Sequence, residues 1–269
     1  MQISVLSIIF MAVSAVISIG LPIALFIFLY KKHGAKFLPM IIGAAAFIIF
    51  ALILESAIHF FVLKTFSLKE KPLIYILYGI FMAGIFEETA RFISFKILQK
   101  KNYTGISTGL SYGVGHGGIE AVLLAGVSMV SAIVLSIIIN TGSIEIITNK
   151  LEGTALEQMN VQIDLLVTTK SYMFLLSGIE RTFAIIIQIS LSVIVFYSVF
   201  CKNKMWLFPL AILLHAIIDL PAAAYQVGVI KNVLLVEGTV CLSAAGIVVL
   251  VINVHKKLKR ELEKAGTTA

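Results

Sequence analysis

Seven long apolar runs constrain the fold of this chain more than any other feature of its sequence. They cover residues 3–30, 37–63, 73–98, 106–139, 165–200, 205–226 and 229–254. A helix that crosses about 30 Å of hydrocarbon needs about 20 such residues at about 1.5 Å each. Only 13% of the residues are charged, against about a quarter in a soluble domain. The sequence therefore predicts an all-α fold, a polytopic membrane bundle of about seven transmembrane helices.

The first run is a membrane-crossing helix and not a signal peptide, because no basic segment precedes it and its apolar part is too long. The fourth and fifth runs exceed one crossing, so each is expected to contain a break or an interfacial extension. The sequence has no recognisable internal repeat and no separate soluble segment. We therefore expect residues 1–269 to form a single integral-membrane domain.

The distribution of lysine and arginine predicts how the bundle is oriented. With the N-terminus outside, thirteen of these residues lie on the inner side and six on the outer side. The predicted topology is N-out and C-in, with a cytoplasmic basic tail at 255–269 and an acidic extracytoplasmic loop at about 141–164. Attraction of the inner side to anionic lipid explains the net charge of +7, and no nucleic-acid partner is needed. The predicted location is the cell membrane, as a multi-pass protein of a bacterial plasma membrane.

Several ionisable side chains interrupt the apolar runs far from their ends. Besides histidines, they are Glu87, Glu88, Arg91, Glu120, Glu180, Arg181 and Asp219. Each costs about 2.5–3.5 kcal/mol at the centre of a membrane helix, or roughly 20 kcal/mol for the set. A typical domain is stable by only about 5–15 kcal/mol. These groups must therefore face one another or a hydrated cavity.

The motif EETAR places two adjacent glutamates and an arginine in the third run. Arg91 stands four residues after Glu87 and three after Glu88, so one guanidinium can hold both carboxylates on one helix face. Two neighbouring carboxylates share their affinity for protons, so one of them can remain a base while the arginine holds the pair.

Two further motifs each place a histidine four residues before an acid. HGGIE contains His116 and Glu120, and HAIID contains His215 and Asp219. At this spacing the carboxylate can fix the tautomer of the imidazole. Glu87, His116 and His215 each lie about 14–21 Å into their runs by helical rise, which predicts that they meet in the middle of the bilayer. Glycines around His116, in SYGVGHGG, allow another helix to approach closely.

Each of these features also has a purely structural reading, because a buried histidine or Glu–Arg pair often clamps membrane helices. Glu180 and Arg181 favour that reading, since adjacent residues point about 100° apart on a helix. Glu55 and His59, near the end of the second run, are expected to be interfacial. Two His-x-x-x-acid pairs and a diglutamate at similar depth favour one shared site.

Carboxylates, imidazoles and a water in an apolar pocket are the parts of a hydrolytic site. The same groups can bind zinc, in which case we expect Glu87, His116 and His215 to be the ligands, although no obligatory cofactor is predicted. The chain has no His-Glu-x-x-His, no Gly-x-Ser-Gly and no second intramembrane aspartate. Site-2-type, rhomboid-type and aspartyl proteases are therefore disfavoured.

EETAR, the glycine-rich run with His116, and HAIID together resemble the YhfC family of intramembrane proteases. That family is related to the CAAX prenyl endopeptidases, the bacteriocin-processing proteins and the PrsW-type proteases. The resemblance covers nearly the whole chain, including GIERTFAIIIQIS in the fifth run. It implies an intramembrane endopeptidase that acts on a membrane-embedded or membrane-associated peptide within the lipid bilayer.

The resemblance also implies roles for individual residues. Glu87 and His116 would activate the water, and His215 would stabilise the oxyanion. Glu88 and Arg91 would shape the surroundings of the base.

The chain departs from the pattern of the larger group at two positions. That group has Glu-Glu-x-x-x-Arg, whereas Arg91 stands one residue earlier and contacts the glutamates from a different angle. Asp219 replaces the common asparagine. Because an ionised aspartate cannot donate to an oxyanion, Asp219 is expected to orient His215. Glu120, Glu180 and Arg181 are expected to support the site.

Two other functions remain open at this stage. Buried acids also mark ion paths, so a transporter or proton-coupled carrier is the first alternative, although the chain lacks the duplicated halves of many transporters. The second is a family member without catalysis that acts as a binding or immunity factor.

Overall fold

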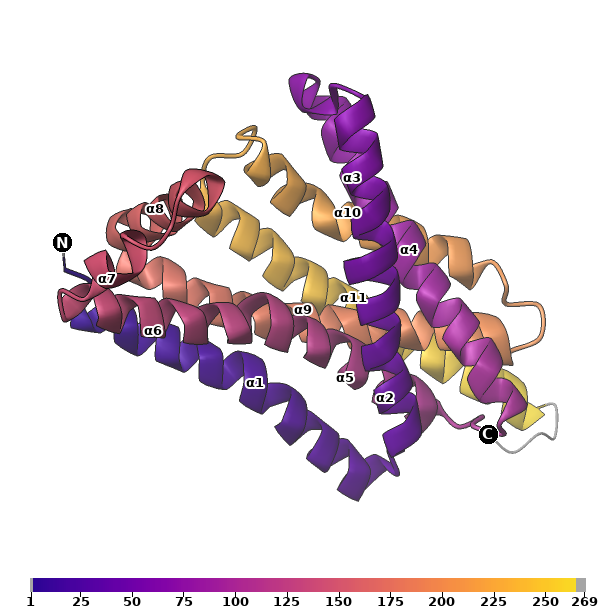
Figure 1. Ribbon diagram of the computed structural model, residues 1–269. Coiled ribbons are helices and arrows are strands. Elements are labelled where there is room, and N and C mark those ends of the chain that lie inside the picture. The colour runs from indigo at the N-terminus through magenta and orange to yellow at the C-terminus, as the bar shows by residue number, and fades with distance from the viewer. Residues whose placement is uncertain (1, 265–269) are drawn as a thin grey trace. The chain divides into compact units, whose positions relative to one another are not determined.

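The computed structural model describes residues 2–264, except for the side chains of Lys69 and of residues 259–264. Every regular element within that range is a helix (Figure 1), which confirms the all-α prediction. In chain order the elements are α1 (Val5–His33), α2 (Phe37–Ala46), η1 (Phe47–Glu55), α3 (Ser56–Thr65), η2 (Leu68–Glu70), α4 (Pro72–Lys100), α5 (Ile106–Ala121), η3 (Val122–Gly126), α6 (Val127–Asn140), α7 (Ile144–Thr148), α8 (Gly153–Thr168), α9 (Ser171–Phe200), α10 (Leu207–Gln226) and α11 (Val233–Lys264).

Seven helices in the described part of the chain are long and apolar enough to cross a membrane, as predicted. They are α1, the continuous α2–η1–α3, α4, the continuous α5–η3–α6, α9, α10 and α11 up to Leu258. The fourth runs for 35 residues without a break, and the π-helical turn η3 lies within it. The alternative expectation for this run, an interfacial extension, stays a prediction. The fifth begins at Ser171, because residues 165–168 belong to α8.

Helix ends follow from residues with restricted or unusual backbone geometry. Pro72 occupies the start of α4, where its missing N–H costs no hydrogen bond. Gly34 directly follows α1 with φ 64° and Gly228 follows α10 with φ 78°, in the left-handed region that commonly ends a helix. Asn102 ends α4 in the same way with φ 62°. The connections that follow α1, α4 and α10 are therefore short, whereas α7 and α8 lie between the fourth and fifth spans.

The described helices form two compact units. The first contains the residues up to Leu21 together with Ala121–Thr182, and the second contains Pro22–Glu120 and the residues from Phe183 onward. Helices α1, α5 and α9 each run from one unit into the other. The expectation of a single integral-membrane domain remains a prediction.

In the first unit, α7 and α8 occupy most of the expected loop at 141–164, and neither is among the helices that could cross a membrane. The extracytoplasmic position of this segment stays a prediction. Helix α8 packs against α6, and it buries Ile163 and Leu166, which lie three residues apart on one helix face. Asn140 secures the N-terminus of this unit: its Oδ1 accepts from Ile3 N at 2.7 Å, and its Nδ2 donates to Ile3 O at 2.9 Å.

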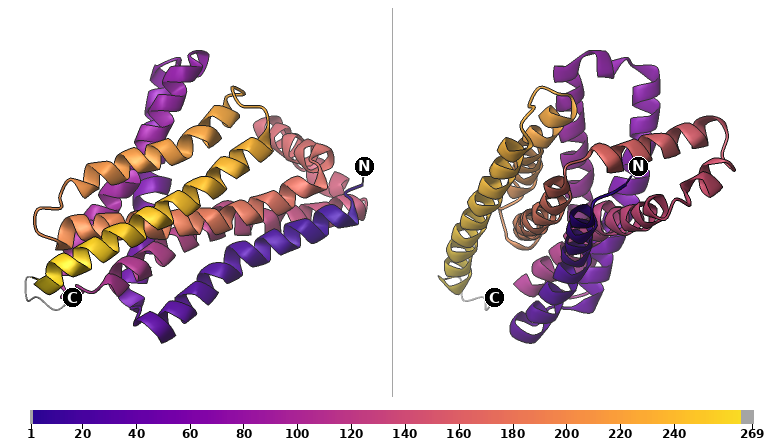
Figure 2. Two further views of the ribbon diagram at one scale, coloured as in Figure 1. Left: turned by 180° about the vertical axis from the view of Figure 1, so that it is seen from behind. Right: turned by 90° about the vertical axis from the view of Figure 1, so that its left-hand side faces the viewer.

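The second unit has its core along α9. Leu191, Ile194 and Val195 are at most 1% exposed there. Helix α4 packs against α2, η1 and α10, and α10 lies beside α11 (Figure 2). Helix α11 continues through Lys264, so much of the predicted tail at 255–269 is helical, and residues 265–269 lie outside the described range.

Glycines on α5 allow two neighbouring helices to approach it, as predicted. A Cβ atom on Gly113 would lie only 2.6 Å from Ile189 Cα of α9. A Cβ atom on Gly115 would collide with the carbonyl of Met40 in α2. Helix α5 is therefore packed backbone against backbone, which fixes the position of the histidine that it carries.

Candidate active site

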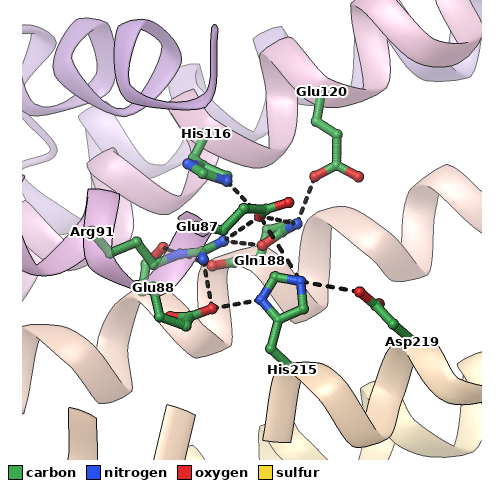
Figure 3. A network of polar contacts seen from close by, with 9 residues as sticks. Glu87, Glu88, Arg91, His116, Glu120, Gln188, His215 and Asp219 are labelled. Carbon is green, nitrogen blue, oxygen red and sulfur yellow. Dashed lines mark hydrogen bonds and ion pairs between the residues drawn. The ribbon is translucent and has the colours of Figure 1, made fainter. Parts of the chain in front are cut away.

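Four helices of the second unit bring polar side chains together within the membrane-crossing part of the chain (Figure 3). The residues are Glu87, Glu88 and Arg91 from α4, His116 and Glu120 from α5, Gln188 from α9, and His215 and Asp219 from α10. All but Asp219 are buried; the Asp219 side chain is 39% exposed.

Glu87 stands at the centre of the group. Its Oε2 atom lies 2.9 Å from His116 Nε2 and 3.1 Å from Gln188 Nε2. Arg91 Nη2 lies 3.4 Å from the same oxygen, and His215 Nε2 lies 4.0 Å away. The other oxygen, Oε1, accepts no hydrogen bond from the described residues. Glu87 thus has one oxygen with several partners and one without a hydrogen-bond donor among the described residues.

Glu88 is completely buried and turns toward α10. Its Oε1 accepts from Arg91 Nη1 at 2.6 Å and lies 2.7 Å from His215 Nδ1. Its Oε2 has no hydrogen-bond partner among the described residues. Glu88 therefore joins the arginine to the histidine of the HAIID motif.

Arg91 is also completely buried, and it holds both glutamates as EETAR predicted. It additionally donates from Nε to Ser192 Oγ at 3.2 Å and from Nη2 to Gln188 Oε1. One guanidinium balances only one of the two glutamate charges. A proton or a bound cation would balance the second.

His215 lies between two carboxylates. Besides the contact of Nδ1 with Glu88, its Nε2 atom lies 3.3 Å from Asp219 Oδ2. This pair has the i,i+4 arrangement predicted from HAIID. The ring orientation is fixed by both neighbours, one on α4 and one on its own helix.

Gln188 is a member of the site that the sequence analysis missed, because only ionisable residues were considered there. Its Nε2 donates to Glu87 Oε2 at 3.1 Å and to Glu120 Oε2 at 2.6 Å. The available signal was an amide within the apolar run FAIIIQIS, since a polar side chain inside a membrane helix needs a partner.

A metal ion would find suitable donors in this group. Glu87, His116 and Glu120 each offer one ligand atom, and these atoms lie within 4.8 Å of one another. Imidazole and carboxylate are ordinary zinc ligands. His116 Nδ1 is buried and has no hydrogen-bond partner among the described residues. The residues therefore fit a metal ion. The sequence predicted Glu87, His116 and His215 as its ligands, whereas the group that the structure brings together contains Glu120 in place of His215.

Two predicted supporting residues, Glu180 and Arg181, belong to the first unit, where they pair with each other. Glu55 and His59 hydrogen-bond each other, and their interfacial position stays a prediction. Glu55 is buried and lies 3.0 Å from His59 Nε2, and His59 Nδ1 lies 2.8 Å from Tyr78 Oη. Helix α4 supplies the tyrosine, so packing between spans buries Glu55, whereas the His59 side chain is 30% exposed.

Comparisons with known proteins identify the family of this chain. A family model described as YhfC intramembrane metalloprotease matches residues 17–240. YhfC of Bacillus subtilis (strain 168), an uncharacterized membrane protein, is 41% identical over 245 residues, which cover 89% of this chain and 93% of the relative. No solved structure matches the chain. The kinship with CAAX-type and PrsW-type proteases stays a prediction, and the family description favours a metal in the site. The chain is a multi-pass membrane protein, and it belongs to the YhfC family of intramembrane metalloproteases.

Proposed function

We propose that this chain is an endopeptidase that hydrolyses a peptide bond of a membrane-embedded or membrane-associated substrate, with Glu87 at the centre of its site. The observation that carries the proposal is the convergence of imidazole, amide and guanidinium groups on one oxygen of this glutamate. Such convergence supports a preorganised reacting group more than a simple helix clamp, because one neutralising partner would be enough for a clamp.

Glu87 takes the proton of the attacking water. Its Oε2 is held in place, while Oε1 has no donor among the described residues and is free to accept that proton. A general base must reach the proton that it removes, at about 2.6–3.2 Å between heavy atoms. The same carboxyl group then delivers the proton to the leaving amine, which completes hydrolysis without a net gain or loss of protons.

His215 stabilises the oxyanion. Carboxylates lie near both of its ring nitrogens, so both nitrogens can carry a proton. Glu88 holds the Nδ1 side, and Nε2–H can leave Asp219 for the developing oxyanion. A donor that is oriented before the reaction costs no reorganisation during it.

His116, Glu120 and Glu87 would hold a metal ion such as zinc. When bound, the ion would polarise the scissile carbonyl and lower the pKa of a coordinated water. With or without the metal ion, Arg91 keeps Glu87 in position, and Gln188 does the same for Glu87 and Glu120. The substrate is a peptide segment at membrane depth, because all of these residues lie on membrane-crossing helices.

The test is a search for products. Protein reconstituted into liposomes is incubated with a library of membrane peptides in water enriched in ¹⁸O, and the products are identified by mass spectrometry. We expect cleaved peptides that carry ¹⁸O in the new carboxyl group, and none from Glu87→Gln protein. A folded wild-type protein that yields no product but conducts protons in a Glu87-dependent manner would instead support the carrier function.

A further inference from the structure

Gln188 is the one side chain among the labelled residues of Figure 3 that has no ionisable group, and it hydrogen-bonds Arg91, Glu87 and Glu120. Its Oε1 accepts from Arg91, and its Nε2 donates to Glu87 and Glu120. The residue is 6% exposed. Each hydrogen-bonding atom of the amide is therefore used within the site.

The partners determine which way this amide is oriented. An arginine can only donate, so the atom that faces Arg91 must be the oxygen. The NH₂ group then faces the two carboxylates, to which it gives one hydrogen each. The reversed orientation would place a carbonyl oxygen 2.6 Å from Glu120 Oε2, where two acceptors repel each other. No other side-chain type of this length combines one acceptor with two donors.

The backbone around Gln188 is built for this contact. A Cβ atom on Gly117 of α5 would lie 2.8 Å from Gln188 Cβ, so the glycine lets α9 come close enough for the amide to reach across. Glu87 on α4 and Glu120 on α5 are thereby joined through a third helix. These two glutamates are also members of the proposed metal-binding group.

We propose that Gln188 is a positioning residue that holds the carboxylates of Glu87 and Glu120 together as ligands for a divalent metal ion. The inference rests on the proposed function, which it extends from the ligands to the residue that orients them. Groups that hydrogen-bond to metal ligands typically affect metal affinity or activity by about 10–100-fold.

The experiment compares zinc affinity in purified full-length protein, measured by competition with a chromophoric chelator. Gln188→Met keeps the length of the side chain but removes both donors and the acceptor. Gln188→Asn keeps the amide but is one methylene too short to reach the glutamates. We expect both variants to lose about 10–100-fold in zinc affinity and to lower kcat while KM for the peptide changes little.

Two matched controls lie on the same helix. Ser192→Ala removes the other contact of α9 with Arg91 and leaves the carboxylates untouched. Ser190 is also buried, but its hydroxyl donates to Ile186 O within the helix. We expect Ser192→Ala and Ser190→Ala to bind zinc with nearly wild-type affinity, and thermal unfolding verifies that all four variants are folded.

Wild-type zinc affinity in folded Gln188→Met protein would overturn the proposal, and so would an equal loss in Ser192→Ala protein. If the wild-type protein cleaves peptides but binds no zinc, the metal part of the proposed function fails, and an unchanged kcat in Gln188→Met would then reject the positioning role as well. If the wild-type protein binds zinc but cleaves nothing, the hydrolytic part of the proposed function is wrong. The positioning role of Gln188 is then tested by the zinc affinities of the variants alone.

Discussion

Arg91→Met is expected to lower the free energy of unfolding strongly. The structure also predicts that a second substitution, Glu88→Gln, restores part of this free energy. Arg91 is completely buried and donates to Glu87, Glu88, Gln188 and Ser192. Removing one partner of a buried ion pair typically costs about 3–5 kcal/mol, because the other charge is left uncompensated. A loss of this size is a large part of the roughly 5–15 kcal/mol that stabilises a typical domain.

In Arg91→Met protein, Glu88 is the carboxylate whose charge is left least compensated. Its Oε1 is shared by Arg91 and His215, and its Oε2 has no partner among the described residues. Without the arginine, Glu88→Gln removes a buried charge while its amide oxygen can still accept from His215. We therefore expect the double variant to regain about 1–3 kcal/mol relative to Arg91→Met alone. In the wild-type background, Glu88→Gln should destabilise instead, because it weakens the pair.

The assay is reversible unfolding in detergent micelles, followed by circular dichroism for the wild type, both single variants and the double variant. Arg91→Lys serves as the matched control: it keeps the charge but loses the fork geometry, so it should lie between wild type and Arg91→Met. The reasoning is refuted if Arg91→Met loses less than about 1 kcal/mol. It is also refuted if the losses of the two single variants simply add in the double variant.

Three further predictions follow from the packing, the metal-binding group and the topology. Gly115→Ala should lower the free energy of unfolding by about 1–3 kcal/mol through overpacking. Gly79→Ala should not destabilise, because its added Cβ would meet nothing within 4 Å. Thermal unfolding compares the two variants, and equal stabilities would contradict the packing argument. Protein purified without added metal should contain stoichiometric zinc by elemental analysis, and His116→Ala should abolish this. Chelation should remove activity and added zinc should restore it, so full activity without metal would argue against the site. Single-cysteine labelling of intact cells should reach residues 145–157 but not the C-terminal tail; labelling of the tail from outside would reverse the topology.

Apolar length was enough to predict the membrane-crossing helices, because the cost of exposing polar backbone in lipid leaves few alternatives. The predicted run 106–139 and the observed helix Ile106–Asn140 differ by one residue at one end. Segment 141–164 was predicted as a connection between spans, but the two helices within it were not predicted, because no long apolar run marks them. The apolar stripe that includes Ile163 and Leu166 shows why α8 forms there.

Helical spacing predicted the contacts within each motif, such as Arg91 with the two glutamates. It could not predict which residues of different helices meet, since that depends on how closely the backbones approach. The glycines of α5 bring Gln188 within reach of the site, and its amide carries no charge that would have drawn attention in the sequence. The same limit explains why the sequence did not predict that Glu120 lies with Glu87 and His116 in the group that could hold a metal ion.

The most direct test of the proposed function is the turnover of Glu87→Gln protein on a cognate peptide in reconstituted membranes. Glutamine keeps the size of the side chain and can still accept from His116 and Arg91, so the variant should insert and fold, with some loss of stability from the weakened pair with Arg91. Loss of a general base typically costs about 10²–10⁴ in rate, and we expect a fall in kcat of this size, with Glu88→Gln intermediate between this variant and wild type. A Glu87→Gln protein that is folded and cleaves at nearly the wild-type rate would show that the glutamate is only structural, and would contradict the proposed function.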